Sequence, residues 1–290
     1  MRSDFSVDTS SRMRRRRYQR RPMSSVVRCL CASAALLLLA CREQEVEHEG
    51  KPIAYWVQQM TNPDSAIRHQ AVAAFAHDAG RSPEAARALL EALGSEAEAD
   101  VHATIAEALG TLGPNALPAA PALVRLLDDE HEQVRQSAAS ALGSLGARSP
   151  LVIPALIHAL DDPAHDVRAA AVDGLAGEGP AAASAASRLA RIVSTDRIGW
   201  VRLRATLALG SIRAEPDLVI PILVRVAQTD DWPMLRAAAV DALASYSPAH
   251  RAVSLAIEAA TRDTSPDVRA AALRARRAVA PTLRDSSQAR

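Results

Sequence analysis

Cysteine and aromatic residues are scarce in this chain of 290 residues. Its three cysteines are Cys29, Cys31 and Cys41, and none follows in the rest of the sequence. The chain after Cys41 can therefore form neither a disulfide nor a cysteine-ligated zinc site. Aromatic residues make up 3% of the sequence against 49% hydrophobic residues, so the core must be built from alanine, leucine, valine and isoleucine.

Sequence motifs for catalysis are absent as well. The eight histidines form no HExxH pair, and there is neither a GxSxG nucleophile turn nor a glycine-rich phosphate loop. Paired acids such as Asp161-Asp162 stand in front of predicted helices, where carboxylates cap backbone N–H groups. We therefore predict no catalytic residue, no metal site and no cofactor, and we expect the chain not to be an enzyme.

Charge is distributed unevenly along the chain. Residues 1–40 contain nine arginines and two aspartates, a net charge of +7, whereas the remainder holds 25 basic and 31 acidic residues, a net charge of −6. A mildly acidic body lacks the clustered lysines and arginines that bind nucleic acid. The composition excludes nucleic acid as a partner, and the basic head needs a separate explanation.

The first forty residues have the organisation of an export signal. Arginines precede an apolar run of about 12 residues, which is shorter than the roughly 20 residues of a membrane-spanning helix. Residues 38–41, Leu-Leu-Ala-Cys, resemble the lipobox of bacterial lipoproteins, in which the cysteine is acylated and becomes the first residue after cleavage. This resemblance implies a signal peptide over 1–40 and a lipid on Cys41.

Several features of this segment stay open. The chain can start at Met1, Met13 or Met23, because the basic region is unusually long. The apolar run can also be an uncleaved anchor in the inner membrane. Arginine and not aspartate follows Cys41, so the common inner-membrane retention signal of lipoproteins is absent, and we expect attachment to the outer membrane, facing the periplasm. Residues 41–50 then form a lipidated, charged tether.

One unit of 33 or 34 residues recurs seven times after the tether. Each copy contains an apolar residue, the anchor, followed directly by a basic residue. The anchors are Ile67, Val101, Val134, Val167, Val201, Leu235 and Val268. A fixed period of this length is typical of stacked structural repeats.

Each unit predicts two helices. A small or apolar residue follows four positions after the anchor, and in six units a leucine or phenylalanine follows eight positions after it, so all three lie on one helix face. A further apolar stretch precedes each such helix, for example SPLVIPALIHAL at 149–160. Neither helix can bury its apolar face alone, so the units must stack. The predicted fold is an all-α solenoid of about seven repeats over 51–280, followed by a disordered tail at 281–290.

An aspartate stands six positions before the arginine in the last five units. These pairs are Asp129/Arg135, Asp162/Arg168, Asp196/Arg202, Asp230/Arg236 and Asp263/Arg269. The pattern resembles the HEAT-repeat family, in particular its short bacterial variety, in which this aspartate and arginine form a ladder between successive repeats. The resemblance implies a right-handed superhelix. Asn62/Arg68 and Glu96/His102 depart from the pattern, which predicts looser or differently paired first repeats.

The second helix of each repeat is expected to line the binding surface of such a solenoid. Residues one and five positions after the basic residue should be exposed there. Three of them are acidic, namely Glu107, Asp173 and Asp241, and this mild acidity favours a cationic partner.

The fifth and sixth repeats interrupt that polar surface with apolar and aromatic residues. These are Trp200, Leu203, Leu207 and Trp232. Exposed side chains of this kind mark interaction sites when they cluster, so we predict a partner-binding hot spot here. In the alternative interpretation, the tryptophans pack over helix starts and the leucines pack between repeats.

These features favour a membrane-anchored periplasmic lipoprotein whose HEAT-repeat solenoid is a scaffold for binding another protein. Two alternatives stay open. The short bacterial repeats are also similar to the phycobilin lyases, which implies a protein that handles a tetrapyrrole or another small molecule. The chain can also be a structural envelope protein without a stoichiometric partner.

Overall fold

The computed structural model describes residues 47–48, 51–78, 83–96, 98–247 and 249–288. Cys41, the predicted signal peptide and most of the predicted tether lie outside these residues. The last residues of the tether include β1 (Glu47–His48), which pairs antiparallel with β2 (Lys51–Pro52). Within the part of the chain that is described, no helix combines the length and the apolar composition needed to cross a bilayer.

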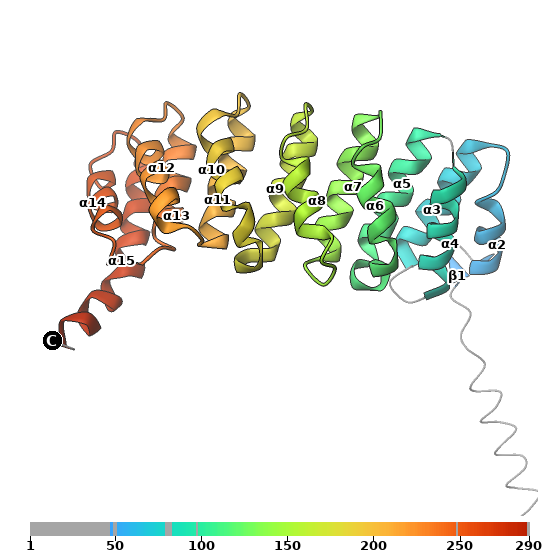
Figure 1. Cartoon of the computed structure of the whole chain (residues 1–290), viewed down its shortest axis with the longest axis horizontal. Helices are drawn as coiled ribbons and strands as arrows, with labels where there is room; N and C mark the ends of the chain where they lie inside the picture. Colours follow the sequence, from blue (N-terminus) through green and yellow to red (C-terminus); the bar gives the residue numbers. More distant parts are fainter. Residues whose placement is uncertain (1–46, 49–50, 79–82, 97, 248, 289–290) are drawn as a thin grey trace, which may run out of the picture. The chain divides into compact units, whose positions relative to one another are not determined.

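Seven helical pairs follow one another through the described residues (Figure 1). The first helices of the pairs are α2 (Ile53–Gln59), α4 (Pro83–Ser95), α6 (Ala120–Leu126), α8 (Val152–Ala159), α10 (Ala186–Thr195), α12 (Pro216–Thr229) and α14 (Arg251–Ala260). The second helices are α3 (Ser65–Asp78), α5 (Ala99–Thr111), α7 (Glu132–Leu145), α9 (His165–Glu178), α11 (Gly199–Ile212), α13 (Pro233–Leu243) and α15 (Pro266–Gln288). This arrangement confirms the predicted all-α solenoid of two-helix repeats.

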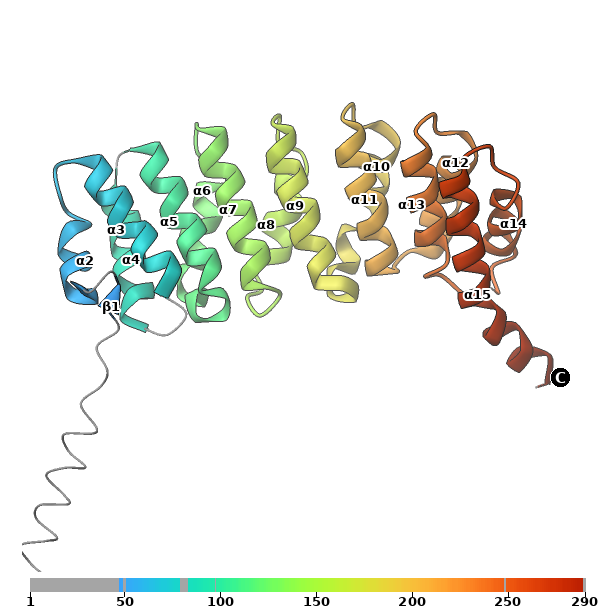
Figure 2. The ribbon, with the colours of Figure 1, turned by 180° about the vertical axis from the view of Figure 1, so that it is seen from behind.

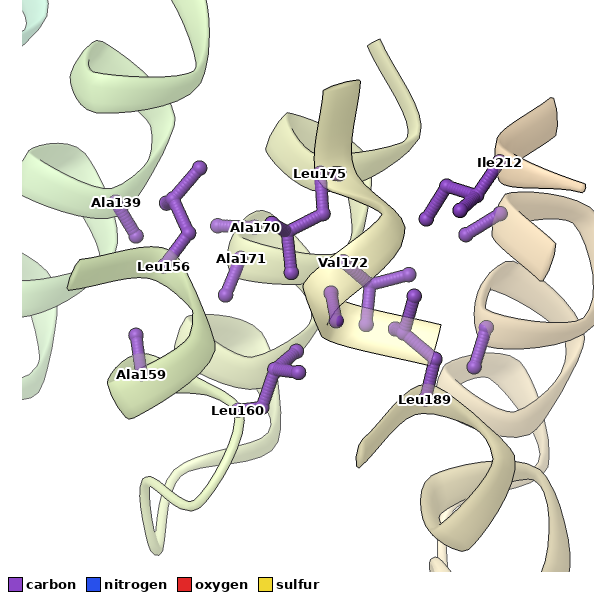
Figure 3. Packing of buried hydrophobic residues seen from close by; sticks show 14 of the residues in the cluster. Ala139, Leu156, Ala159, Leu160, Ala170, Ala171, Val172, Leu175, Leu189 and Ile212 are labelled. Carbon is purple, nitrogen blue, oxygen red and sulfur yellow. The ribbon is translucent and has the colours of Figure 1, made fainter. Parts of the chain in front are cut away.

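The apolar positions identified from the spacing form the core. The residue four positions after the anchor is 0% exposed in all seven repeats, and the leucine or phenylalanine eight positions after it is at most 2% exposed in the six repeats that have one. Figure 3 shows side chains from successive helices, such as Leu156, Leu175, Leu189 and Ile212, in one continuous layer. Each repeat therefore depends on its neighbours to complete its core.

Second helices pack against each other more extensively than first helices do (Figure 2). The close approach relies on small residues seven and nine positions after the anchor, a feature that the sequence analysis missed. A Cβ added to Gly143 of α7 would lie 2.7 Å from the Cα of Gly174 in α9, and one added to Gly110 of α5 would lie 3.0 Å from the Cα of Ala141. Backbone contacts this short leave no room for a larger side chain.

The described connections between consecutive repeats differ. Gly113 and Gly179 adopt φ values of 52° and 53°, which favour glycine, and each opens a short 3-10 helix, η2 (Gly113–Ala119) or η3 (Gly179–Ala185). The connection from α11 to α12 lacks glycine, and Arg213 and Glu215 take positive φ values there.

Buried Tyr246 supports this last connection. Its hydroxyl lies within hydrogen-bonding distance of the carbonyls of Leu209 (3.1 Å) and Ala214 (3.3 Å), at the C-terminal end of α11 and just beyond it. Burial raises the pKa of Tyr246 to about 12, so the hydroxyl keeps its proton. The phenol thereby adds a hydrogen bond at the end of α11, where the carbonyl of Leu209 also accepts one from the backbone N–H of Arg213 at 3.0 Å.

The C-terminal boundary differs from the sequence prediction. Residues 281–288, expected as a disordered tail, belong to the last part of α15. The chain contains no glycine after Gly210, so the sequence offers no residue that readily adopts the left-handed conformation of a helix end.

Two glycine substitutions should have opposite effects on stability. We expect Gly143→Ala to lower the free energy of unfolding by about 1–3 kcal/mol, because its Cβ would overlap the neighbouring helix backbone. Gly177→Ala is the matched control: it lies in a helix with nothing within 4 Å of the added Cβ and should stabilise the protein by about 0.5 kcal/mol. Urea unfolding followed by circular dichroism measures both. Equal effects would contradict the close packing of second helices.

Candidate partner-binding surface

A carboxylate in the turn before the second helix connects neighbouring repeats. At Asp162, the carboxylate accepts hydrogen bonds from Nε (2.7 Å) and Nη2 (3.1 Å) of Arg135 in the preceding repeat. It also accepts one from the backbone N–H of Ala164 in its own turn, at 2.8 Å. The backbone carbonyl of Asp162 accepts a hydrogen bond from Nη1 of Arg168, at 2.9 Å. One aspartate thus fixes its turn and links two repeats.

Arginine–carboxylate contacts of this kind form the rungs of a ladder. The described rungs, with their shortest distances, are Arg68–Glu96 (2.8 Å), Arg135–Asp162 (2.7 Å), Arg168–Asp196 (2.8 Å), Arg202–Asp230 (3.7 Å) and Arg236–Asp263 (2.8 Å). Each arginine therefore pairs with the carboxylate of the next repeat. The residue six positions before it, which is an aspartate in every described rung except that of Arg68, contributes only a backbone carbonyl to this arginine. Glu96 takes the role of aspartate in the first rung.

The hydrogen bonds of a rung shift the pKa values of its members. Arg236 lowers the pKa of the Asp263 carboxyl, and the same contact raises the pKa of the Arg236 guanidinium. Burial raises the pKa of Asp196, but hydrogen bonds from Arg168 and from the backbone N–H of Ile198 outweigh it, so the net shift is downward. The carboxyls of Asp263 and Asp196 and the guanidinium of Arg236 are therefore charged at neutral pH.

The ladder is incomplete at one junction. His102 occupies the place of the arginine in the second repeat, and its Nε2 lies 3.3 Å from the carbonyl oxygen of Leu93. Asp129 of the third repeat instead contacts its own turn, through the backbone N–H and the ring Nδ1 of His131 at 2.8 and 3.0 Å. No salt bridge within the described residues links the second repeat to the third at this position.

Two clefts lie beside the imperfect rungs. A cleft of about 480 Å³ borders the long Arg202–Asp230 contact and is also lined by Ser194 and Arg225. A cleft of about 450 Å³ lies next to His102. The repeats therefore leave space between them where the rung is long or missing.

The exposed surface of the second helices follows a simple register. The residue directly before the anchor is exposed in every repeat, and the residue six positions after the anchor lies on the same helix face because the two are seven residues apart. The residues six positions after the anchor are Ala73, Glu107, Ser140, Asp173, Leu207, Asp241 and Arg274. Asp241 is half-buried and the other six are exposed.

Four apolar residues in α11, in α13 or directly before α13 lie at or next to this surface. Trp200 and Met234, each directly before an anchor, are 59% and 49% exposed, and Leu207 is 48% exposed. The ring of Trp200 stands edge-on to the ring of half-buried Trp232, with 4.9 Å between their centroids. Trp200, Leu207, Trp232 and Met234 are together termed the apolar patch.

The ladder turn holds Trp232 in place. Its backbone N–H donates to Oδ1 of Asp230 at 2.9 Å, and its ring packs against the core and over Gly199, where an added Cβ would lie 3.5 Å from ring atoms. Trp232 therefore forms a fixed support for the exposed ring of Trp200.

Leu203 does not belong to this surface, contrary to the prediction. It is 7% exposed and packs in the core cluster. Its position, directly after the basic residue, lies on the flank of the second helix, and the equivalent Ala103 is 1% exposed. Because second helices approach closely, neighbours cover this flank at Ala103 and Leu203, whereas the equivalent Gln136 stays exposed.

Met234 was missed from the sequence. It lies next to Leu235, a buried anchor, and therefore does not stand out in a helical apolar pattern. The register that exposes Trp200 also exposes Met234, since both directly precede an anchor. That equivalence was available from the alignment of repeats.

The three predicted acidic residues all have partners in the following repeat. Asp173 pairs with Arg204, and Asp241 pairs with Nη2 of Arg274 at 2.8 Å. Glu107 accepts a hydrogen bond from the hydroxyl of Ser137, at 3.0 Å. Two of the three carboxylates are thus neutralised locally, which weakens the sequence argument for a cationic partner.

Metal ligands do not cluster in the described part of the chain. No group of three or more histidine, cysteine, aspartate or glutamate side chains comes close enough there to hold an ion. His131 and His165 each contact an aspartate of their own turn, at 3.0 Å.

A family model described as HEAT repeats matches the chain over most of its length. The matched residues are 53–143, 118–176, 153–244 and 186–277. No curated protein matches the chain.

Solved structures show the same kind of fold. An engineered protein is 23% identical, with a TM-score of 0.54, and the match covers 79% of this chain and 68% of that protein. The archaeal HEAT-like repeats protein of Thermococcus onnurineus is 15% identical, with a TM-score of 0.54 and coverage of 79% and 97%. The complex of CpcE and CpcF of phycocyanin lyase from a Nostoc species is 23% identical, with a TM-score of 0.48 and coverage of 82% and 98%. The two similarities with a TM-score of 0.54 concern the fold alone.

Proposed function

Because the chain belongs to the HEAT-repeat family, we propose that it is a scaffold without catalytic activity that binds a protein partner on the surface lined by its second helices. The apolar patch is the observation that carries this proposal. It exposes Trp200, Leu207 and Met234 on a surface that is otherwise polar or composed of small residues.

The patch has the composition of a protein-binding hot spot. Tryptophan is enriched among the residues that dominate binding energies, and methionine adapts to irregular apolar surfaces. Ion pairs flank it on both sides, Asp173–Arg204 toward the preceding repeat and Asp241–Arg274 toward the following one. An apolar centre with a polar rim is the usual organisation of a protein interface.

The partner should present apolar side chains to this patch. Because the flanking carboxylates already have arginine partners, binding does not require a cationic segment. Helices α11 and α13 are packed into the core, so the patch is held on rigid elements and loses little conformational entropy on binding.

We further propose that the scaffold is a lipoprotein of the outer membrane, facing the periplasm. This part rests on the order of basic region, short apolar run and Leu-Leu-Ala-Cys sequence before Arg42. Two or more acyl chains on Cys41 would anchor the protein stably, where a single chain would bind reversibly.

Replacing Cys41 tests the anchoring. In Cys41→Ser the acylation site and the cleavage site are both lost, so incorporation of radiolabelled palmitate should disappear and the protein should keep its signal peptide and migrate as a larger species. Cys31→Ser is the matched control and should keep both the label and the size of the wild-type protein. Wild-type protein that carries no palmitate and has the same size as Cys41→Ser would show an uncleaved anchor.

Leu207→Glu tests the apolar patch. We expect it to reduce in-cell crosslinking to the dominant partner at least tenfold, because a charge would be buried at the centre of the interface. Leu218→Glu, at a residue of α12 that is 42% exposed, is the control and should leave the yield unchanged. Leu203 is unsuitable for this test because it is buried.

Other outcomes favour other functions. Equal crosslinking in Leu207→Glu and wild-type protein would place the partner elsewhere. Absence of any reproducible partner would favour a structural envelope protein. Visible absorbance of the purified full-length protein would favour the handling of a tetrapyrrole.

A further inference from the structure

The C-terminal end of the solenoid lacks half of a rung. In every junction with a short rung, the arginine donates hydrogen bonds from Nη1 to backbone carbonyls of its own turn, and from Nε or Nη2 to the carboxylate of the next repeat. Arg236 does so with the carbonyl of Asp230 and the carboxylate of Asp263. Arg269 makes the hydrogen bonds to its own turn, because its Nη1 donates to the carbonyls of Asp263 (2.7 Å) and Thr264 (2.8 Å). No carboxylate among the side chains that the structure describes binds its other edge.

The core of the last repeat is also uncovered on that side. The residue five positions after the anchor is at most 1% exposed in six repeats, whether it is valine, alanine or threonine. In the seventh repeat it is Leu273, which is 49% exposed. The following repeat therefore covers this position at every internal junction, and nothing described covers it at the end.

Helix α14 shows the same pattern on its outer flank. Val219 and Val226 of α12 are buried, whereas Ala252 and Ala259, their equivalents 33 residues later in α14, are exposed. Leu255, on the same flank between them, is 58% exposed. Terminal repeats of solenoids ordinarily have a polar outer face, so two exposed leucines on this end are unusual.

We infer that this C-terminal end, formed by Leu255, Arg269 and Leu273, is a second interface, on which an acidic partner protein stacks a helical pair in the manner of an eighth repeat. The partner would offer a carboxylate to the free edge of Arg269 and apolar side chains to the two leucines. Its acidic character follows from charge complementarity: apart from Arg274, which pairs with Asp241, residues 249–279 hold five arginines against three acidic residues, a net charge of +2.

A second copy of this chain does not fit the end. Its first repeat has Asn62 in the place of the ladder aspartate, and that amide is already bonded to Gln59 and to the backbone N–H of Asp64. Its last repeat carries the same positive charge and would repel an identical end. A second copy is therefore not the occupant that we propose.

This interface shares no residue with the apolar patch, and the two proposals can fail separately. Trp200→Ala should affect only the first surface, and Leu273→Glu only the second. Leu273 is exposed, so its replacement should leave the fold intact, which circular dichroism of the full-length protein verifies.

The test is site-specific photocrosslinking in cells, with p-benzoyl-phenylalanine at position 273 of the full-length protein. Position 218, on a first helix away from the end, is the matched control. We expect one dominant product at 273 and not at 218, containing an acidic protein whose crosslinked segment carries aspartate or glutamate. With the photoprobe moved to position 255, Leu273→Glu and Arg269→Glu should each reduce the yield at least fivefold. Arg269→Lys, which keeps the charge but not the bidentate geometry, should reduce it less.

Three results would overturn the inference. They are the absence of a product specific to positions 255 and 273, a product whose yield is insensitive to both Arg269→Glu and Leu273→Glu, and crosslinking to a second copy of the same chain. Loss of the product with Trp200→Ala would assign it to the apolar patch instead and would likewise exclude an independent second interface.

Discussion

The carboxylate in the turn before a second helix, which pairs with an arginine across five of the six junctions, is the contact on which most of this solenoid depends. It accepts hydrogen bonds from the arginine of the preceding repeat and from its own turn, so the start of one second helix is fixed to the preceding one. With these starts in register, the small residues farther along the second helices meet, as at Gly143 and Gly174. Side chains between the two contacts then close the core. Stability is therefore a property of junctions more than of single repeats.

The junction between the fifth and sixth repeats differs from the others and carries the apolar patch. The contact between Arg202 and Asp230 is the long one, at 3.7 Å. The same junction carries a cleft along its rung and the apolar patch on the surface of its second helices. Asp230 binds the backbone of Trp232 and so helps to position the pair of tryptophan rings. The least tightly bridged of the arginine–carboxylate junctions is thus also the one that exposes most aromatic surface.

Periodicity made the fold predictable, and contacts between repeats limited what could be predicted at the surface. The spacing of anchors correctly predicted Leu142 and Leu175 in the core and Leu207 on the outer face. The geometry of a single helix is enough to decide on which face each of these residues lies. Leu203 was misplaced because its burial depends on a neighbouring helix. The partners of Asp173 and Asp241 lie 31 and 33 residues later, at arginines that no motif singles out. Alignment of the repeats would have identified Met234, since it occupies the position of Trp200.

Restoring the missing rung tests most directly whether rungs hold the repeats together. In His102→Arg, the new guanidinium would face Asp129 as Arg135 faces Asp162, and the adjacent cleft has room for the longer side chain. The measurement is the free energy of unfolding of the full-length protein in urea. The account predicts an increase of about 1–3 kcal/mol that disappears when Asp129 is also replaced by asparagine. No increase, or an equal increase in the Asp129→Asn background, would contradict it.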